Sequence, residues 1–215
     1  TTGAGNTAVG YAALRSGTTV GGHTAIGFEA LYNTTAAEST AIGYQAGRSN
    51  TTGTTHVFVG LQAGYSNTTG NSLTALGYTA LFSNTTGSSN VAVGREALQA
   101  NTTASNNTAV GYQAGYSNTT GTTNVAIGRA TLFTNTTASY NTAVGDQAGY
   151  YVTGGSNTYV GFYAGVGTGG SNSASNNAGF GYYALSTVTS GSYNAAFGGQ
   201  SLQNDTTGAY NTALG

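Results

Sequence analysis

The stretch NTAVGYQAGYSNTTGTTNVAIG, residues 107–128, decides the fold. Its last five residues, 124–128, nearly restate its first five, 107–111, seventeen positions later. The glycine that closes this five-residue segment recurs thirteen times along the chain, mostly at intervals of seventeen residues. These glycines are Gly10, Gly27, Gly43, Gly60, Gly77, Gly94, Gly111, Gly128, Gly145, Gly161, Gly181, Gly198 and Gly215. Self-similarity at a fixed short period is the sequence signature of a repeat architecture.

Each repeat combines a short segment rich in Val, Ile, Thr and Ala with a cluster of Gly, Asn, Ser and Thr. Such segments predict strands and turns rather than helices. Units this short cannot bury a face alone, but they form a continuous core when they stack. The sequence therefore predicts an all-β, parallel β-solenoid or β-roll of thirteen repeats of about seventeen residues, with one repeat per coil.

Positions within the repeat, numbered from the residue that is most often Asn, predict which side chains form the core. Position 4 is always apolar, position 5 is always Gly and position 8 is always small. Because strand side chains alternate between faces, we place positions 2 and 4 inside and position 3 outside, where Phe58 and Tyr159 would fit. The glycine at position 5 predicts a corner of the coil. Position 8 then points inward, where opposing walls approach each other.

The predicted core is thin, and a second surface buried between chains would stabilise it. Position 9 is Leu or Gly, and aromatic residues follow it in several repeats. We therefore expect a homo-oligomer, with a homotrimer favoured, or a self-assembling fibre. The candidate contact residues are Leu14, Leu31, Leu81, Leu98, Leu132, Leu185, Leu202, Tyr32, Phe82 and Phe133.

The repeats indicate one continuous array over residues 1–215, with an irregular loop insertion around 150–176. This insertion contains Gly-Gly pairs at 154–155 and 169–170. Neither end shows a capping repeat, which solenoids need for solubility. We therefore expect the chain to be a segment of a longer array.

Composition excludes several classes of protein. Charged residues make up 4% of the chain, the formal net charge is −1, and there is no Cys. No basic patch for nucleic acid is present, and no apolar run approaches the ~18–20 residues of a membrane-spanning helix. Disulfides and Cys-ligated metals are excluded as well.

The titratable residues give no sign of a catalytic centre. His23 and His56 both occupy position 1, two coils apart, so about 9–10 Å would separate them at the spacing of paired strands. This distance is too long to share a metal ion, and we interpret both as replacements for the usual Asn. The acids form no pair. We therefore predict no enzyme and no catalytic, cofactor or metal site.

Aromatic residues recur at position 6 and allow two interpretations. They could bind sugars or surfaces as a ladder, or they could stack to stabilise the solenoid or an interface between chains. The residues concerned are Tyr11, Phe28, Tyr44, Tyr78, Tyr112, Phe162 and Tyr182.

Asn-Thr-Thr recurs in the turn and matches the acceptor motif for N-glycosylation. The same residues are also ordinary turn formers, so both interpretations stay open. The motif begins at Asn33, Asn50, Asn67, Asn84, Asn101, Asn118 and Asn135, and related matches begin at Asn106 and Asn204.

Threonine rows suggest a further function, because flat threonine arrays on solenoids can match ice. Residues 52–54 and 120–122 read Thr-Gly-Thr, but neighbouring repeats interrupt the pattern. An ice-binding β-solenoid is therefore the weaker alternative.

The units at 39–46 (STAIGYQA) and 107–114 (NTAVGYQA) resemble the S-V-A-I-G head repeats of trimeric autotransporter adhesins. They are equally similar to the NTAxGYxAL…NTTG arrays of phage tail fibres. The resemblance covers essentially the whole chain. It implies a left-handed parallel β-roll, three chains per fibre, and exposure on a cell or virion surface. It also implies adhesion or host recognition, with a surface glycan or a matrix component as the ligand.

These observations together favour a non-enzymatic structural and adhesive extracellular fibre module. A glycan-coated extracellular filament subunit and the ice-binding solenoid are the alternatives. We expect no nucleic-acid partner, and no membrane contact within this segment.

Overall fold

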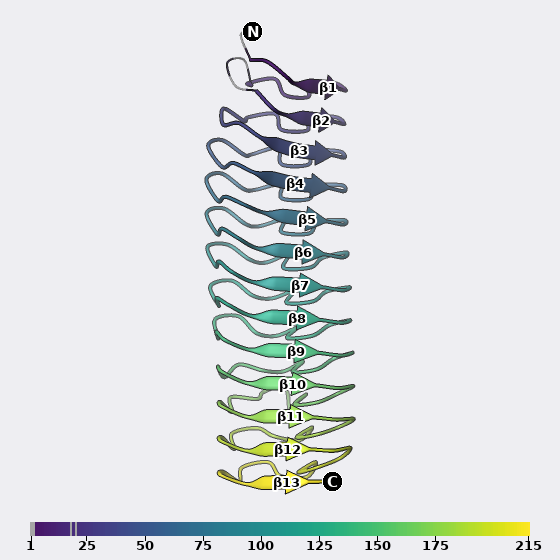
Figure 1. The fold of residues 1–215 in the computed structure, drawn as a ribbon, viewed down its shortest axis with the longest axis vertical. Coiled ribbons are helices and arrows are strands. Elements are labelled where there is room, and N and C mark those ends of the chain that lie inside the picture. Colours follow the sequence, from purple (N-terminus) through teal and green to yellow (C-terminus); the bar gives the residue numbers. More distant parts are fainter. Residues whose placement is uncertain (1–2, 18, 20) are drawn as a thin grey trace. The chain divides into compact units, whose positions relative to one another are not determined.

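The computed structural model describes residues 3–17, 19 and 21–215, in two compact units, Thr1–Asn106 and Asn107–Gly215. Every helix or strand assigned in this described part is a short β-strand, and each is followed by a long turn (Figure 1). The first unit contains β1 (Thr7–Val9), β2 (Thr24–Ile26), β3 (Ser39–Ile42), β4 (His56–Val59), β5 (Thr74–Leu76) and β6 (Val91–Val93). The second unit contains β7 (Thr108–Val110), β8 (Val125–Ile127), β9 (Thr142–Val144), β10 (Thr158–Val160), β11 (Ala178–Phe180), β12 (Ala195–Phe197) and β13 (Thr212–Leu214).

Within each unit, a strand pairs in parallel with the strand of the next repeat. Equivalent positions face each other: Ala25 of β2 lies opposite Ala8 of β1 and Ala41 of β3. In the second unit, Ala126 and Ala143 pair in the same way. Like residues therefore stack on like along the array, and the predicted parallel β-solenoid with one repeat per coil is confirmed. We number the coils 1 to 13 in chain order, each from its position 1.

The glycine at position 5 turns the chain sharply after each strand. Gly43 has a φ of +139°, a conformation that side chains other than glycine rarely adopt. A Cβ built on Gly43 would lie only 2.3 Å from the carbonyl oxygen of Gly60 in the next coil. Both the dihedral angle and the close approach of the next coil require glycine at this corner.

The predicted orientation of the strand side chains is wrong. Position 3 points inward, and its alanines, such as Ala41 and Ala126, are buried. Position 4 points outward: Ile42 and Ile127 are 39% and 38% exposed. The prediction assumed that branched residues mark the core, whereas the coil is so flat that alanine fills its interior. Position 8 does point inward, as predicted, and Ala46 opposes the strand.

The leucines at position 9 also lie inside the coil, and not on an interface between chains as predicted. Leu31, Leu81, Leu98, Leu132 and Leu185 are at most 2% exposed. They complete the core beside the alanines of positions 3 and 8. The remaining two, Leu14 and Leu202, are half-buried.

Two large aromatic residues at position 3 are accommodated because glycine replaces leucine at position 9. Phe58 is fully buried, and a Cβ at Gly64 of the same coil or Gly47 of the preceding coil would lie within 2.6 Å of its ring. Tyr159 is equally buried and would contact a Cβ on Gly165 at 2.3 Å. A large residue at position 3 and a leucine at position 9 therefore compete for one volume.

The irregular stretch at 150–176 contains a regular strand. β10 lies within it and pairs in register with both β9 and β11. The three extra residues of coil 10 form a turn near Gly169 and Gly170, both at positive φ, with a bridge between Thr168 and Ser171. The repeat pattern gives no sign of the division into two units, because Asn107 begins a regular repeat.

Asparagine side chains line the interior as hydrogen-bonded columns. In the second unit, the Asn at position 1 accepts through Oδ1 from the backbone N–H of its counterpart in the next coil, as between Asn107 and Asn124 at 2.9 Å. Its Nδ2 donates to the carbonyl oxygen of position 15 in its own coil, as from Asn107 to Gly121 at 2.9 Å. The amide thus ties each strand both to the next coil and to the opposite wall.

A second column runs through position 12. In the first unit, Asn67 donates through Nδ2 to Oδ1 of Asn50 at 2.8 Å, and Asn84 donates to Asn67 at 2.9 Å. The same Nδ2 of Asn67 also donates to the carbonyl oxygen of Gly70, which closes the turn three residues later. Buried amides are costly without partners, and these columns supply the partners.

Candidate functional site

Most of the exposed large apolar residues of each unit lie at two positions of the repeat, which together we call the outer face; Val57 at position 2 and Tyr140, Tyr193 and Tyr210 at position 17 are exposed elsewhere. The outer face consists of the side chains at positions 4 and 6, on the outward side of the strands and just beyond the corner glycine. Its most exposed apolar members in the first unit are Val9, Tyr11, Ile26, Phe28, Ile42, Tyr44, Leu61, Leu76 and Tyr78. Those in the second unit are Val110, Tyr112, Ile127, Phe162, Tyr182, Phe197 and Leu214. Contiguous apolar surfaces of this kind mark sites of association more often than single exposed residues do.

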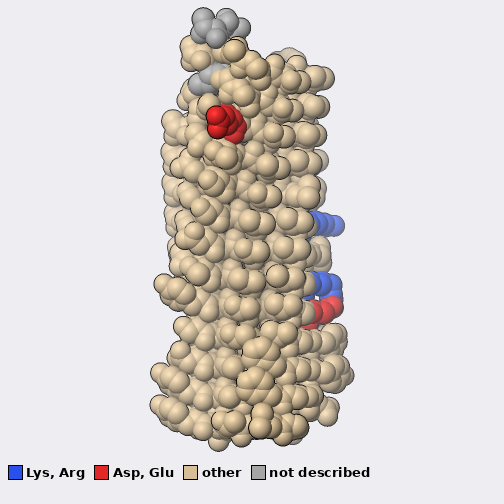
Figure 2. All heavy atoms as spheres, in the orientation of Figure 1, with Lys and Arg blue, Asp and Glu red and all other residues tan. Residues whose placement is uncertain are grey.

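The outer face carries few charges, and the charges on it are paired. The guanidinium of Arg129 donates two hydrogen bonds of 2.9 Å to the carboxylate of Asp146 in the next coil. Arg95 pairs with Glu96 at 2.9 Å and lies 5.5 Å from the ring centre of Tyr78. In the view of Figure 2, charged side chains are sparse and lie mainly along one edge. Pairing lowers the cost of covering the outer face with another apolar surface.

The aromatic residues at position 6 stack on one another where they are consecutive. Ring centres lie 5.2 Å apart between Tyr11 and Phe28, and 5.1 Å apart between Phe28 and Tyr44. Phe162 and Tyr182 stack at 5.6 Å. Stacked rings cover each other's faces and present their edges outward. This geometry favours the stacking interpretation over a ladder of open platforms for sugar rings.

The other two members of the predicted ladder are separated from these stacks. Tyr78 lies beside Arg95, as described above, and Tyr112 is 43% exposed at the first coil of the second unit. Arg129 and Asp146 occupy position 6 in the two coils that follow Tyr112. The structure therefore brings the seven predicted residues together only in part.

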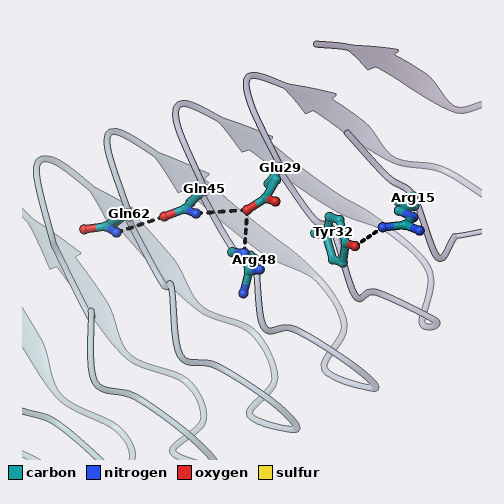
Figure 3. Close-up of polar contacts among 6 residues, drawn as sticks. All are labelled: Arg15, Glu29, Tyr32, Gln45, Arg48 and Gln62. Carbon is teal, nitrogen blue, oxygen red and sulfur yellow. Dashed lines mark hydrogen bonds and ion pairs between the residues drawn. The ribbon is translucent and has the colours of Figure 1, made fainter. Parts of the chain in front are cut away.

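A polar strip formed by positions 7 and 10 lies on coils 1 to 4. Glu29, Gln45 and Gln62 follow one another at position 7, and Gln45 donates to Glu29 at 2.9 Å (Figure 3). Arg48, at position 10, donates to the same oxygen of Glu29 at 2.6 Å. Tyr32 lies between two guanidiniums, with Arg48 and Arg15 each 5.2 Å from its ring centre.

Hydrogen bonds set the ionisation of this strip. The Arg48 and Gln45 side chains lower the pKa of Glu29 from its ordinary value, because both donate to its charged form. The hydrogen bond to Glu29 in turn raises the pKa of Arg48. Arg15 donates a hydrogen bond to the hydroxyl of Tyr32. Hydrogen bonds therefore hold the planar polar groups of the strip in fixed positions. The sequence analysis did not predict the strip, because its members come from different repeats.

The structure places six of the seven Asn-Thr-Thr asparagines inside the solenoid. Asn50, Asn67, Asn84, Asn101, Asn118 and Asn135 are at most 1% exposed and belong to the position 12 column. Asn33 falls one position earlier in a sixteen-residue repeat and is half-buried, while Thr34 takes the buried place and accepts from Asn50. Asn106 and Asn204 are exposed. Burial of Nδ2 argues against glycosylation of the six in the folded chain.

The two histidines replace the position 1 asparagine as hydrogen-bond acceptors. His23 accepts through Nδ1 from the backbone N–H of Ser39 at 3.2 Å, and His56 accepts from that of Leu73 at 3.3 Å. Both rings are at most 2% exposed. This arrangement matches the interpretation of these residues as structural replacements for Asn.

The threonine rows are largely occupied by the hydrogen bonds of the turns. Thr51 and Thr68, at position 13, donate through Oγ1 to the carbonyl oxygen of position 13 in the next coil. The hydroxyl of Thr54 bonds to Asn71, and that of Thr122 bonds to Ser139. The Thr-Gly-Thr motifs therefore present one open row, at position 14, which does not favour a two-row ice-binding surface.

No protein-family profile, no curated protein and no solved structure matches this chain. Within the residues that the structure describes, none of the elements is a helix with the length and apolarity needed to cross a membrane.

Proposed function

We propose that the chain is a non-enzymatic structural and adhesive module of an extracellular fibre, on a cell or virion surface. The observation that carries the proposal is the outer face, which repeats coil by coil. A surface of this regularity suits repeated attachment better than a single reaction centre. The interior columns of amides and alanines give each unit the rigidity that a fibre needs.

Copies of the chain associate through the outer face, in the homotrimer that the sequence favours. Six strands at about 4.8 Å spacing, with some 13–16 Å of strand and corner each, give roughly 370–460 Å² for the face of the first unit. This area is in the range of the largest apolar patch on a typical monomer, about 300–600 Å², and such patches are often functional. The pairing of Arg129 with Asp146 lowers the cost of burying this part of the outer face.

The polar strip on coils 1 to 4 is our candidate for adhesion. Its Gln, Glu, Arg and Tyr side chains are held in place by one another and combine donors, acceptors and an aromatic surface. Such a set suits a neutral or weakly charged surface glycan. Binding of the assembled protein to immobilised glycans and matrix components would test this assignment.

Sedimentation velocity of outer-face variants tests the proposed assembly. We expect the unmodified protein to sediment with three times the mass of one chain. Ile42→Asp and Ile127→Asp should shift it to the single-chain mass, because a charge would be buried at the interface. Both side chains are already more than a third exposed, so the fold itself should tolerate the change.

Thr69→Asp and Thr120→Asp are the matched controls, since both lie on the exposed row at position 14. They should leave the mass unchanged. A single-chain mass for the unmodified protein would refute self-association. Dissociation of the controls together with the outer-face variants would show that the effect is not specific to the outer face.

A further inference from the structure

We propose that protonation of His56 opens coils 2 to 4, residues 23–72, which makes this segment an acid-sensitive release point in the first unit. The proposal concerns the coil structure itself and is independent of assembly and adhesion. It follows from the hydrogen bonds that the two imidazoles make in place of asparagine.

At position 1 the structure needs an acceptor for the backbone N–H of the next coil. Asparagine supplies Oδ1, which cannot be protonated near neutral pH. His56 supplies Nδ1, which accepts from Leu73. Since Nδ1 accepts, the ring proton is on Nε2, beside the carbonyl of Gly53 and 3.4 Å from Nδ2 of Asn67. A second proton on Nδ1 would place two donors against each other.

His23 makes the same contact with less support. Its Nδ1 accepts from Ser39, while its Nε2 is buried without a hydrogen-bond partner. The hydroxyl of Ser39 is also buried without one. Coil 2 is therefore less well supported by hydrogen bonds at position 1 than the coils that carry Asn there.

Among the residues that the structure describes around His56, only the Gly53 carbonyl favours a positive charge. The ring of His56 stacks on Phe58 at 4.7 Å, and its other described contacts are Leu73, Asn67 and Gly53. In strand register it faces Ser39, which is uncharged. Around His23 the contacts are Asn6 and Ser39, and the acid next to Ser39 in the chain is the exposed Glu38, which lies beside Gly22.

Burial lowers the pKa of His56 to about 4, and a hydrogen bond to the Gly53 carbonyl offsets this only in part. The unfolded segment takes up the proton near pH 6.5, whereas the folded segment takes it up only near pH 4. The stability that neutral His56 contributes to the folded segment is therefore fully present above pH 6.5 and is lost as the pH falls from 6.5 to 4. The second unit contains no histidine, so this loss is confined to the first.

Hydrogen–deuterium exchange of the intact chain at pH 7 and pH 5 tests the proposal, with rates corrected for the intrinsic effect of pH. Opening of residues 23–72 should increase roughly 20-fold at pH 5, as expected for one histidine whose pKa falls from 6.5 to about 4. Strands β7 to β13 of the second unit serve as the internal reference and should change little.

The double variant His23→Asn/His56→Asn restores the residue found at position 1 in nine repeats. It should remove the pH effect while leaving exchange at pH 7 similar. The proposal is overturned if residues 23–72 exchange equally at both pH values, or if the acid effect persists in the double variant. If the variant folds poorly, the unmodified chain still tests the proposal. Exchange at pH 5 should then increase in residues 23–72 and not in strands β7 to β13, and an equal change in both would overturn it.

Discussion

The two units use the same coil but support it with different amide columns. In the second unit, position 1 is Asn in all seven coils, and each accepts from the backbone of the next coil where one follows. In the first unit, His23, Ser39, His56 and Leu73 interrupt that column. Position 12 shows the reverse: it is Asn in coils 3 to 6 of the first unit and in coils 7 and 8 of the second, whereas Val152, Val188 and Asp205 replace it in coils 9, 11 and 12.

From coil 3 onward, each stretch of coils therefore keeps at least one continuous amide column and varies the other. Where position 1 is mixed, the column from Asn50 to Asn101 is unbroken. Where position 12 becomes Val152 or Val188, the column at position 1 is complete. Replacing an Asn where only one column is continuous should therefore lower the free energy of unfolding more than replacing an Asn where both columns are present.

The largest effect is expected from Asn177→Ala, in a coil where position 12 is Val188. The change leaves the buried N–H of Asn194 and the carbonyl oxygen of Gly191 without the bonds of 2.8 Å that they make to Asn177. Two buried polar groups at 1–3 kcal/mol each give a loss of about 3–4 kcal/mol in the free energy of unfolding. Denaturant unfolding followed by circular dichroism measures this loss.

Asn177→Asp is the matched variant for Asn177→Ala. Burial favours the protonated carboxyl, which keeps an acceptor for Asn194 and supplies an O–H donor for the Gly191 carbonyl oxygen, so its loss should be smaller than that of Asn177→Ala. A loss below about 1 kcal/mol for Asn177→Ala would contradict the role of this column, because desolvated backbone groups cost more than that.

A smaller loss, of about 2 kcal/mol, is expected from Asn67→Ala in the first unit. The change removes bonds to the side chains of Asn50 and Asn84 and to the carbonyl oxygen of Gly70, but no backbone N–H of a strand loses its acceptor. Asn84 keeps its second bond, to the carbonyl oxygen of Gly87. The same unfolding measurement should place Asn67→Ala below Asn177→Ala, and the opposite order would contradict the comparison between the units.

The period of the repeat made most of the fold predictable. A fixed Gly at position 5 and a fixed small residue at position 8 are enough to predict a corner and a close approach of opposing walls. Gly43 and Ala46 occupy those places in the structure. Parallel register followed from the same argument, since identical units stack with identical residues in contact.

The orientation of the strand could not be derived from the sequence in the same way. Asparagine is seldom buried, so Asn107 and Asn124 are typical of a turn. The inward-facing side of the strand is then assigned from the apolar residue at position 4, such as Ile127. That anchor places Phe58 and Tyr159 at the surface, whereas both are buried. The signal that could have corrected this is the glycine at position 9 in both of their coils, which leaves room for a ring inside.

The predicted role of the position 9 leucines in an interface between chains is wrong for the same reason. Leucine at position 9 was assigned to contacts between chains, yet Leu31 and Leu132 fill the coil interior. The polar strip escaped prediction because Glu29 and Arg48 are nineteen residues apart and meet only when coils stack. Side-chain contacts across coils depend on rotamers, which the repeat alone does not specify.

Thiol labelling of single-cysteine variants tests the orientation of the strand most directly, because the chain contains no cysteine of its own. Ala126→Cys should stay unlabelled until the protein unfolds, since position 3 is buried. Thr120→Cys, on the exposed row, should label at once, and Ile127→Cys should label in the single-chain fraction. Rapid labelling of Ala126→Cys together with protection of Ile127→Cys in that fraction would contradict the inward-facing alanine, and with it the amide-lined interior.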